Sequence, residues 1–156
     1  MPGGGLMLYE DILQLADENV LIKEKPLRAN KGRIKGNRIA IKQDMTQTEK
    51  ACILAEELGH YYTTTGCILD QESPENRKQE LRARFWGHNL LVNPANLIKA
   101  FEDGCRNRYE IAEYLEITED FLQEAIDTYR TKYGEYITYK NYTIILSNGI
   151  SMLKMF

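Results

Sequence analysis

The segment that begins at Thr46 constrains the fold of this chain more than any other. Its first four residues have the Ser/Thr-x-x-Glu form of a capping box, which predicts a helix from there to about Tyr62. Five residues at helical spacing predict one buried face: Ala51, Leu54, Ala55, Leu58 and Tyr62. At about 100° per residue, Glu56, Glu57 and His60 share the other face. The helix is therefore expected to present three reactive side chains opposite its core face.

The segments around this helix predict an α+β fold. Further helices are expected over residues 6–17, 74–92, 95–101, 109–115 and 118–132, with Ser73-Pro74 at the start of the second. Strands are expected at 20–22, 33–35, 38–42, 136–139 and 142–146, with hairpin turns at Gly36-Asn37 and Lys140-Asn141. We therefore expect a small antiparallel sheet, a helix-turn-helix-like accessory region and a C-terminal β hairpin. The corresponding division of the chain is 1–93, 94–134 and 135–156.

Composition excludes several classes of protein. The 156 residues are 43% hydrophobic and 28% charged, which suits a domain with a real core and excludes disorder. No apolar run reaches the roughly 18 residues of a membrane span, and the first residues lack the pattern of a signal peptide. We therefore expect a cytoplasmic protein without membrane association. The three cysteines have no close spacing, so neither a disulfide framework nor a cysteine zinc site is indicated.

Charge is distributed unevenly along the chain. Between positions 22 and 42, eight basic residues accompany the single acidic residue Glu24: Lys23, Lys25, Arg28, Lys31, Arg33, Lys35, Arg38 and Lys42. A solvated strand surface is the favoured interpretation, because no aromatic residue is interleaved for stacking on nucleic-acid bases. The predicted helix pair at 109–132 is strongly acidic, which repels phosphates. Direct nucleic-acid binding is therefore not favoured.

The polar face of the first long helix could hold a metal ion. Two ligands at i and i+4, here Glu56 and His60, can bind one ion, and Glu57 could then reach a water molecule at the site. Glu80 on the next helix could add a third ligand, because the small residues Ala83 and Gly87 follow on its face and Gly59 allows close approach from the first helix. The alternatives are a solvated surface for the two consecutive glutamates, and for Glu80 an ion pair with Arg84 at i+4.

Two further residues have an open assignment. His88 lies about 80° around the helix from Glu80, so it could reach the edge of the site as a substitute ligand or as a donor that stabilises an oxyanion. A packing histidine beside Phe85 and Leu81 is the favoured interpretation. Cys67 could approach the site from a loop, although nothing in its spacing requires this.

These motifs resemble a known family. Residues 51–62, residues 79–86 with the apolar run into Pro94, and the helix pair at 111–125 resemble the ImmA/IrrE family of metallopeptidase-like proteins. The resemblance spans about residues 20–146 and implies a zincin-like domain. It implies that His60 and Glu80 are zinc ligands and that Glu57 is the general base that activates water for attack on a peptide carbonyl. Glu56 occupies the position of the family's first histidine ligand. Because this donor set is harder than the family's two-histidine set, Mn²⁺, Fe²⁺ or no metal are alternatives to Zn²⁺.

The resemblance also implies a function. Members of this family are known from phages and other mobile elements, where the substrate is typically a repressor encoded beside the peptidase. We therefore expect a metal-dependent endopeptidase that inactivates a cognate repressor. The alternative is a non-catalytic regulator, or anti-repressor, that keeps the fold and binds the partner without cleaving it. Residues 38–42 are our candidate for the edge strand that holds an extended substrate, and their basic character would favour an acidic substrate segment.

Overall fold

The chain forms two compact units. A computed structural model describes residues 6–64 and 74–155. The N-terminal unit is Leu8–Gly87, and the C-terminal unit is the described part of His88–Phe156 together with Leu6 and Met7. The boundary falls inside a helix, α3, so the expected division into 1–93, 94–134 and 135–156 stays a prediction. The expected helix start at Ser73 lies outside the described residues.

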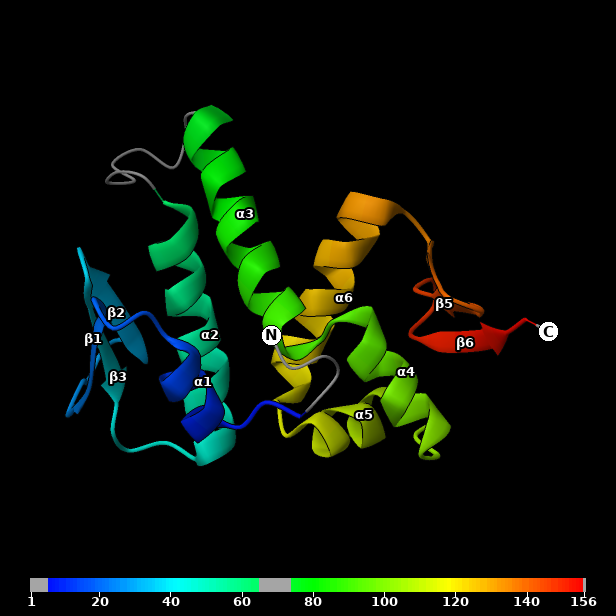
Figure 1. Ribbon diagram of the computed structural model, residues 1–156, viewed down its shortest axis with the longest axis horizontal. Coiled ribbons are helices and arrows are strands. Elements are labelled where there is room, and N and C mark those ends of the chain that lie inside the picture. Colours follow the sequence, from blue (N-terminus) through cyan, green and yellow to red (C-terminus); the bar gives the residue numbers. More distant parts are fainter. Residues whose placement is uncertain (1–5, 65–73, 156) are drawn as a thin grey trace. The chain divides into compact units, whose positions relative to one another are not determined.

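The N-terminal unit places one long helix between a sheet and a second helix (Figure 1). Its elements are α1 (Tyr9–Leu15), β1 (Leu21–Lys25), β2 (Gly32–Lys35), β3 (Arg38–Lys42), α2 (Gln47–Thr63) and the first part of α3 (Pro74–Leu91). α2 contacts β2 and β3 on one side and packs against α1. The long central helix is therefore the element on which the whole unit is assembled.

The three strands of this unit lie in the order β1-β3-β2. The two-residue turn at Gly36-Asn37 joins β2 and β3 as the predicted antiparallel hairpin, with Gly36 at a φ of 61°. β1 instead pairs in parallel with β3, so the sheet is mixed and not wholly antiparallel. Through this pairing Ile22 and Ile34 lie on either side of Ile39, forming one apolar strip.

The prediction that residues 38–42 form an edge strand is wrong. β3 is the central strand, because its alternating Ile39 and Ile41 are almost completely buried, at 2% and 0% exposure. A central position allows both of these side chains to pack toward the core while the backbone pairs on both sides. The edges of the sheet are β1 and β2.

The Thr46 N-cap and most of the predicted core face of α2 are confirmed, and the Glu49 carboxylate accepts a hydrogen bond from the Thr46 hydroxyl at 3.2 Å. The Thr46 hydroxyl accepts a 3.1 Å hydrogen bond from the Glu49 amide. Four of the five expected core residues are at most 2% exposed: Ala51, Leu54, Ala55 and Leu58. The expectation for Tyr62 is wrong, because this residue is 39% exposed at the end of the helix. Its hydroxyl accepts a hydrogen bond from the Asp17 amide at 2.6 Å, and its ring packs on Trp86 with centroids 5.0 Å apart.

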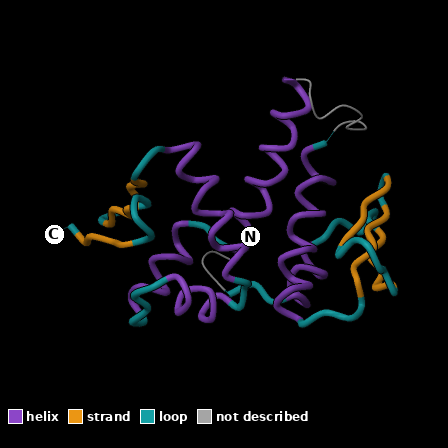
Figure 2. The backbone as a smooth tube through the Cα atoms, turned by 180° about the vertical axis from the view of Figure 1, so that it is seen from behind, coloured by secondary structure: helices purple, strands orange, loops and turns teal. Residues whose placement is uncertain are grey.

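The C-terminal unit combines helices with an antiparallel sheet, and Figure 2 shows its helices in purple and its strands in orange. Its elements after α3 are α4 (Pro94–Glu102), α5 (Arg108–Leu115), α6 (Glu119–Tyr133), β4 (Tyr136–Tyr139), β5 (Tyr142–Ile145) and β6 (Ser151–Lys154). The predicted hairpin of β4 and β5 is confirmed, and β6 adds a third strand after the Asn148-Gly149 turn. The expected C-terminal hairpin therefore supplies two of the three strands of this sheet.

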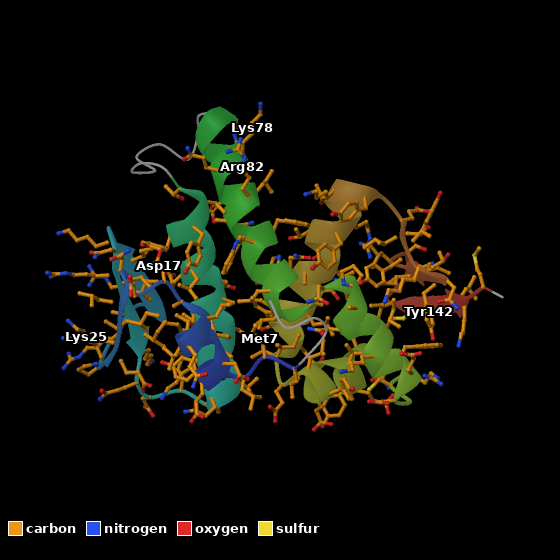
Figure 3. All side chains as sticks on the ribbon, viewed as in Figure 1. Met7, Asp17, Lys25, Lys78, Arg82 and Tyr142 are labelled. Atoms are coloured by element: carbon orange, nitrogen blue, oxygen red, sulfur yellow. The ribbon has the colours of Figure 1, made fainter. Side chains whose placement is uncertain are left out.

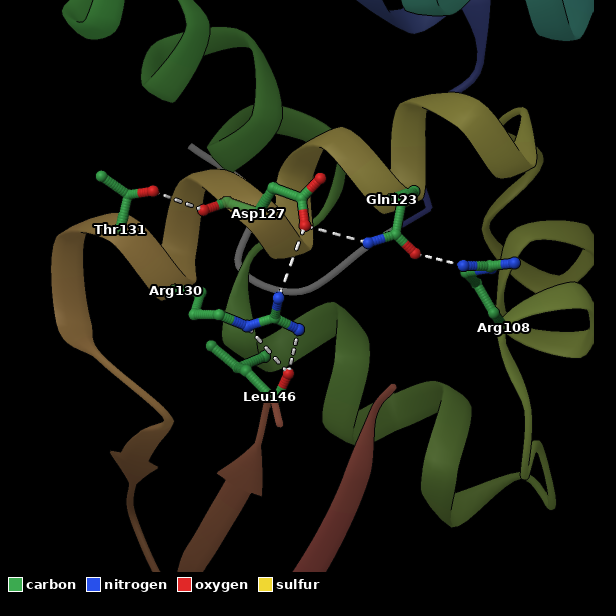
Figure 4. Close-up of polar contacts among 6 residues, drawn as sticks. All are labelled: Arg108, Gln123, Asp127, Arg130, Thr131 and Leu146. Carbon is green, nitrogen blue, oxygen red and sulfur yellow. Dashed lines mark hydrogen bonds and ion pairs between the residues drawn. The ribbon is translucent and has the colours of Figure 1, made fainter. Parts of the chain in front are cut away.

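Polar contacts connect the end of β5 to the helices of the same unit (Figure 4). The Arg130 guanidinium donates through Nε to the Leu146 carbonyl at 3.2 Å, and its Nη1 lies 3.8 Å from Asp127 Oδ1. The Gln123 side chain accepts from Arg108 on α5 and donates to Asp127 at 3.0 Å. These contacts therefore connect α5 to α6, and α6 to the residue that follows β5.

The α+β class is confirmed by this arrangement of helices and small sheets. None of the helices in the described ranges 6–64 and 74–155 has the length and apolar character needed to span a membrane.

An ion pair between a buried lysine and a partly exposed glutamate holds three elements of the N-terminal unit together. Lys50 on α2 is 7% exposed, and its Nζ donates to Glu24 Oε1 on β1 at 2.7 Å. The Tyr9 hydroxyl on α1 donates to the other oxygen of this carboxylate at 3.2 Å. The hydrogen bond from Lys50 holds the pKa of Glu24 below its ordinary value, while burial raises the pKa of Tyr9 to about 12. The ionised carboxylate of Glu24 therefore accepts hydrogen bonds from both Lys50 and Tyr9.

We predict that Glu24→Gln lowers the free energy of unfolding by about 1–3 kcal/mol at pH 7, because the substitution leaves a buried ammonium without its charged partner. The loss should shrink as the pH falls. The native carboxylate has a pKa below its ordinary value of 4.5, so its stabilisation is present above that value and is lost on protonation. Urea denaturation of both proteins between pH 3 and pH 7 measures the difference.

Lys50→Met is the matched control, since it removes the buried charge and keeps the length of the side chain. It should cost less than Glu24→Gln. A difference between wild type and Glu24→Gln that stays constant with pH would contradict the role of the ionised carboxylate.

Candidate functional site

Three polar residues lie within about one turn of α2. Glu56, Glu57 and His60 are each partly buried, whereas the neighbouring Leu58 and Gly59 are fully enclosed. The helix is held by the Thr46 cap at its start and by its buried stripe along its length, so these three side chains share one rigid backbone.

Glycines bring α2 and α3 into backbone contact. A Cβ atom at Gly59 would fall onto the Ala83 carbonyl oxygen, and a Cβ at Gly87 would lie 2.8 Å from the Ala55 carbonyl oxygen. Only residues without a side chain allow this approach at both positions. The close approach expected from the small residues on the two helices is confirmed, and it brings Glu80 to the polar side of α2.

His60 and Glu80 meet across this helix pair. His60 Nδ1 lies 3.7 Å from Glu80 Oε2, and the two side chains are 27% and 20% exposed. The other oxygen of Glu80 lies 3.3 Å from Arg84 Nε one turn later. Glu80 therefore forms the expected ion pair with Arg84 through one carboxylate oxygen. Its second oxygen faces the His60 imidazole, as a ligand shared with the first helix would.

The pair of donors fits a divalent metal ion in type and in spacing. A separation of 3.7 Å is too long for a hydrogen bond. It is close to the distance of about 3.4 Å between two ligands that hold one tetrahedral ion at about 2.0–2.2 Å each. An imidazole and a carboxylate are also ligand types that zinc accepts. The chemistry of this pair therefore suits an ion shared between α2 and α3.

Glu57 lies between this pair and the sheet. A Cβ at Gly32 on β2 would be 3.2 Å from Glu57 Cγ and 3.3 Å from its Oε1, so the strand crosses directly against the carboxylate. Burial raises the pKa of Glu57, His60 opposes the rise and Glu80 adds to it. A carboxyl group with a raised pKa that is coupled to an imidazole and a second carboxylate has the character of a proton acceptor in catalysis.

The third predicted ligand is not gathered with the other two. Within residues 6–64 and 74–155, no group of three or more His, Cys, Asp and Glu side chains is close enough to hold an ion. The structure brings His60 and Glu80 together, the charges of both act on Glu57, and Glu56 lies one turn before His60 on α2. The assignment of Glu56, His60 and Glu80 as a metal site therefore stays a prediction.

His88 packs within the C-terminal unit. It is 2% exposed, its ring meets Phe121 edge-on with centroids 5.1 Å apart, and its Nε2 lies 3.9 Å from Glu124 Oε2. These contacts favour the packing role, with Phe121 as an aromatic partner. Cys67, the other open assignment, lies outside the described residues.

The sequence-based search missed Gly32. A glycine at the start of a short strand is itself a signal, because it often marks a place where another group comes close to the backbone. In this protein the other group is the Glu57 carboxylate together with Ile53, whose Cγ2 would be 2.5 Å from an added Cβ.

Comparisons with known proteins are consistent with this geometry. The family model for the IrrE N-terminal-like domain, a peptidase family, matches residues 14–127, which include α2, α3 and the first sheet. No curated protein and no solved structure matches the chain.

We predict that Gly59→Ala destabilises the protein by about 1–3 kcal/mol, the usual cost of overpacking, because the new methyl group would meet a backbone oxygen that cannot rotate away. Alanine normally stabilises a helix interior relative to glycine by about 1 kcal/mol, so the sign of the change is diagnostic. Chemical denaturation measures it.

Asn89→Ala, at an exposed position on α3, is the control for helix propensity and should be neutral or slightly stabilising. If Gly59→Ala also stabilised the protein, α2 and α3 could not be in the contact described.

Proposed function

The chain belongs to the IrrE N-terminal-like family of metallopeptidase-like proteins, and from this membership we propose that it is a metal-dependent endopeptidase acting on a protein partner. The observation that carries the proposal is the meeting of His60 and Glu80 at 3.7 Å with the partly buried Glu57 beside them. A donor pair for a metal ion with an adjacent carboxyl base is an arrangement suited to metal-assisted hydrolysis of a peptide by water.

In this proposal His60 and Glu80 hold the ion, with Glu56 as the third ligand. A bound zinc ion would supply Lewis acidity, which polarises a peptide carbonyl and makes water more acidic. Arg84 positions Glu80 by pairing with the oxygen that does not face His60. The imidazole on α2 and the carboxylate on α3 would remain in register because the two helix backbones touch at Gly59 and Gly87.

Glu57 acts as the general base. Its carboxylate accepts a proton from the attacking water and returns it to the nitrogen of the departing amine, so one group serves both halves of the reaction. Its raised pKa, which results chiefly from burial, makes the carboxylate a stronger proton acceptor than a solvated glutamate. Contact with Gly32 keeps the side chain beside the strand along which a substrate would lie.

The partner that we propose is a repressor protein encoded by the same phage or mobile element, whose inactivation turns on the genes of that element. The support for this is the membership of the family and the motif resemblance over α2 and α3. Binding without cleavage is the second candidate. It is favoured by Glu56 at the position of the family's first histidine ligand and by the lack of a gathered third donor in the described part of the chain.

We predict that Glu57→Gln lowers the rate of repressor cleavage by about 10²–10⁴-fold, the usual contribution of a general base, and leaves the fold intact. Cleavage of the cognate repressor, followed by gel electrophoresis and mass spectrometry of the products, measures the rate.

Glu18→Gln, an exposed glutamate in the turn after α1, is the matched control and should cleave at the wild-type rate. Unchanged cleavage by Glu57→Gln would remove this residue from the reaction.

We predict that the purified protein binds about one Zn²⁺ per chain. His60→Ala and Glu80→Gln should each weaken metal binding by at least about 10- to 100-fold, which is the cost of losing even an outer partner of a ligand. Elemental analysis gives the stoichiometry and competition with a chelating dye gives the affinity. Glu49→Gln, on the first turn of the same helix, should bind normally. A protein that holds no divalent metal and still inactivates the repressor would favour binding without cleavage.

A further inference from the structure

β2 forms an edge of the first sheet beside the candidate catalytic base. It pairs with β3 on one side, and no other strand within residues 6–64 and 74–155 pairs with it. Gly32, its first residue, lies against Glu57. An extended chain added to this edge would therefore run past the carboxylate.

The register of the hairpin determines which backbone groups face the open edge. The Lys42 amide donates to the Lys31 carbonyl at 2.9 Å, so these two residues form a hydrogen-bonded pair. Because such pairs alternate in an antiparallel ladder, the backbone groups of Arg33 and Lys35 point to β3. The amides and carbonyls of Gly32 and Ile34 point the other way, toward the open edge.

The two faces of β2 differ in chemistry. Gly32 and Ile34 face α2, whereas Arg33 and Lys35 lie on the opposite, solvent-facing side. Register places four more basic residues on this outer face: Lys23, Lys25, Arg38 and Lys42. Lys25 extends away from the helices (Figure 3). The strands contribute no acidic side chain to this face, and none of the six cations forms an ion pair with another described residue.

We propose that the open edge of β2 binds an extended segment of the protein substrate by strand addition, and that this segment carries acidic side chains at alternating positions, opposite Arg33 and Lys35. The inference rests on the proposed peptidase function and specifies its substrate class. The relevant feature is the spacing of the acidic residues, and not only their number.

The alternation follows from strand geometry. In an added strand, successive side chains point to opposite faces of the sheet, whether the strand runs parallel or antiparallel to β2. Side chains on the outer face lie about 4.5–5.5 Å, Cβ to Cβ, from their neighbours on β2, where opposite charges attract. Side chains on the inner face would approach Glu57 and the apolar Ile34, where a carboxylate would be repelled and desolvated. An uninterrupted acidic run would therefore place half of its charges unfavourably.

A peptide fits this surface better than a nucleic acid does. The open edge offers the Gly32 and Ile34 amides and carbonyls, which only another extended main chain satisfies in full. The outer face has no aromatic side chain for stacking on bases. A nucleic acid would use the six cations and ignore the edge, so the two kinds of partner depend on different residues.

The test uses fluorescent eight-residue peptides and the full-length chain in the presence of a chelator, so that binding is measured without cleavage. One peptide carries three glutamates at i, i+2 and i+4, and a second has the same composition with the three glutamates adjacent. Fluorescence anisotropy at about 50 mM salt gives each affinity. We expect the alternating peptide to bind about three- to tenfold more tightly, the effect of two favourable cross-strand charge pairs.

Two double variants locate the effect. Arg33→Ser with Lys35→Ser should abolish the preference for the alternating peptide. Lys23→Ser with Lys25→Ser removes the same charge from the same face at the far edge, and should keep the preference. N-methylation of the peptide amides that pair with β2 should abolish binding, because strand addition needs those groups.

Equal affinity for both peptides, equal losses in both double variants, or unimpaired binding of the N-methylated peptide would each overturn the proposal. So would tighter binding of random-sequence duplex DNA than of the alternating peptide, weakened equally by the two double variants, since this would assign the whole face to a nucleic acid. Alternating peptides that bind but are never cleaved once metal is restored would reject the proposed peptidase function and leave the docking mode intact. Cleavage of the repressor by a protein that shows no preference for the alternating peptide would support the peptidase function and reject the proposed docking mode.

Discussion

The contact between the backbones of α2 and α3 is the constraint on which the candidate site depends. His60 and Glu80 belong to different helices, and two helices that pack through ordinary side chains lie about 8–10 Å apart. At Gly59 and Gly87 the backbone of each helix is in contact with the other, and this brings the imidazole and the carboxylate to 3.7 Å. A larger residue at either position would separate the donors even if every polar residue of the site remained.

The sheet completes the site from the other side of α2. Its central strand is buried through Ile39 and Ile41, which leaves β2 at the edge and places Gly32 against Glu57. One strand thus confines the Glu57 carboxylate and also presents open backbone groups. Its exposed side chains, Arg33 and Lys35, continue a basic face on which a substrate would meet positive charge before it reaches the base. In the proposed function, catalysis and substrate selection would therefore use opposite faces of the same strand.

Local patterns predicted the elements well because short-range physics controls them. The Thr46 cap, the stripe of Leu54, Ala55 and Leu58, and the turn at Gly36-Asn37 all act within a few residues, and all three are observed. The errors concern partners that are distant in the sequence. The pattern of residues 38–42 is compatible with either an edge or a central strand. Tyr62 has core spacing, but it lies where the helix runs past the end of the core, so its ring packs on Trp86 at the surface.

The same distinction between local and long-range interactions applies to the candidate site. By itself the sequence determined that Glu56, Glu57 and His60 share one helix face, because their spacing follows from 3.6 residues per turn. It also identified Glu80 on a helix face with small residues. Only the tertiary structure decided that Glu80 meets His60 through one oxygen while pairing with Arg84 through the other, that His88 packs on Phe121, and that β2 is the strand beside Glu57. The reason is that helix geometry is local, whereas the approach of two backbones and the order of strands depend on how apolar faces far apart in the chain are buried together.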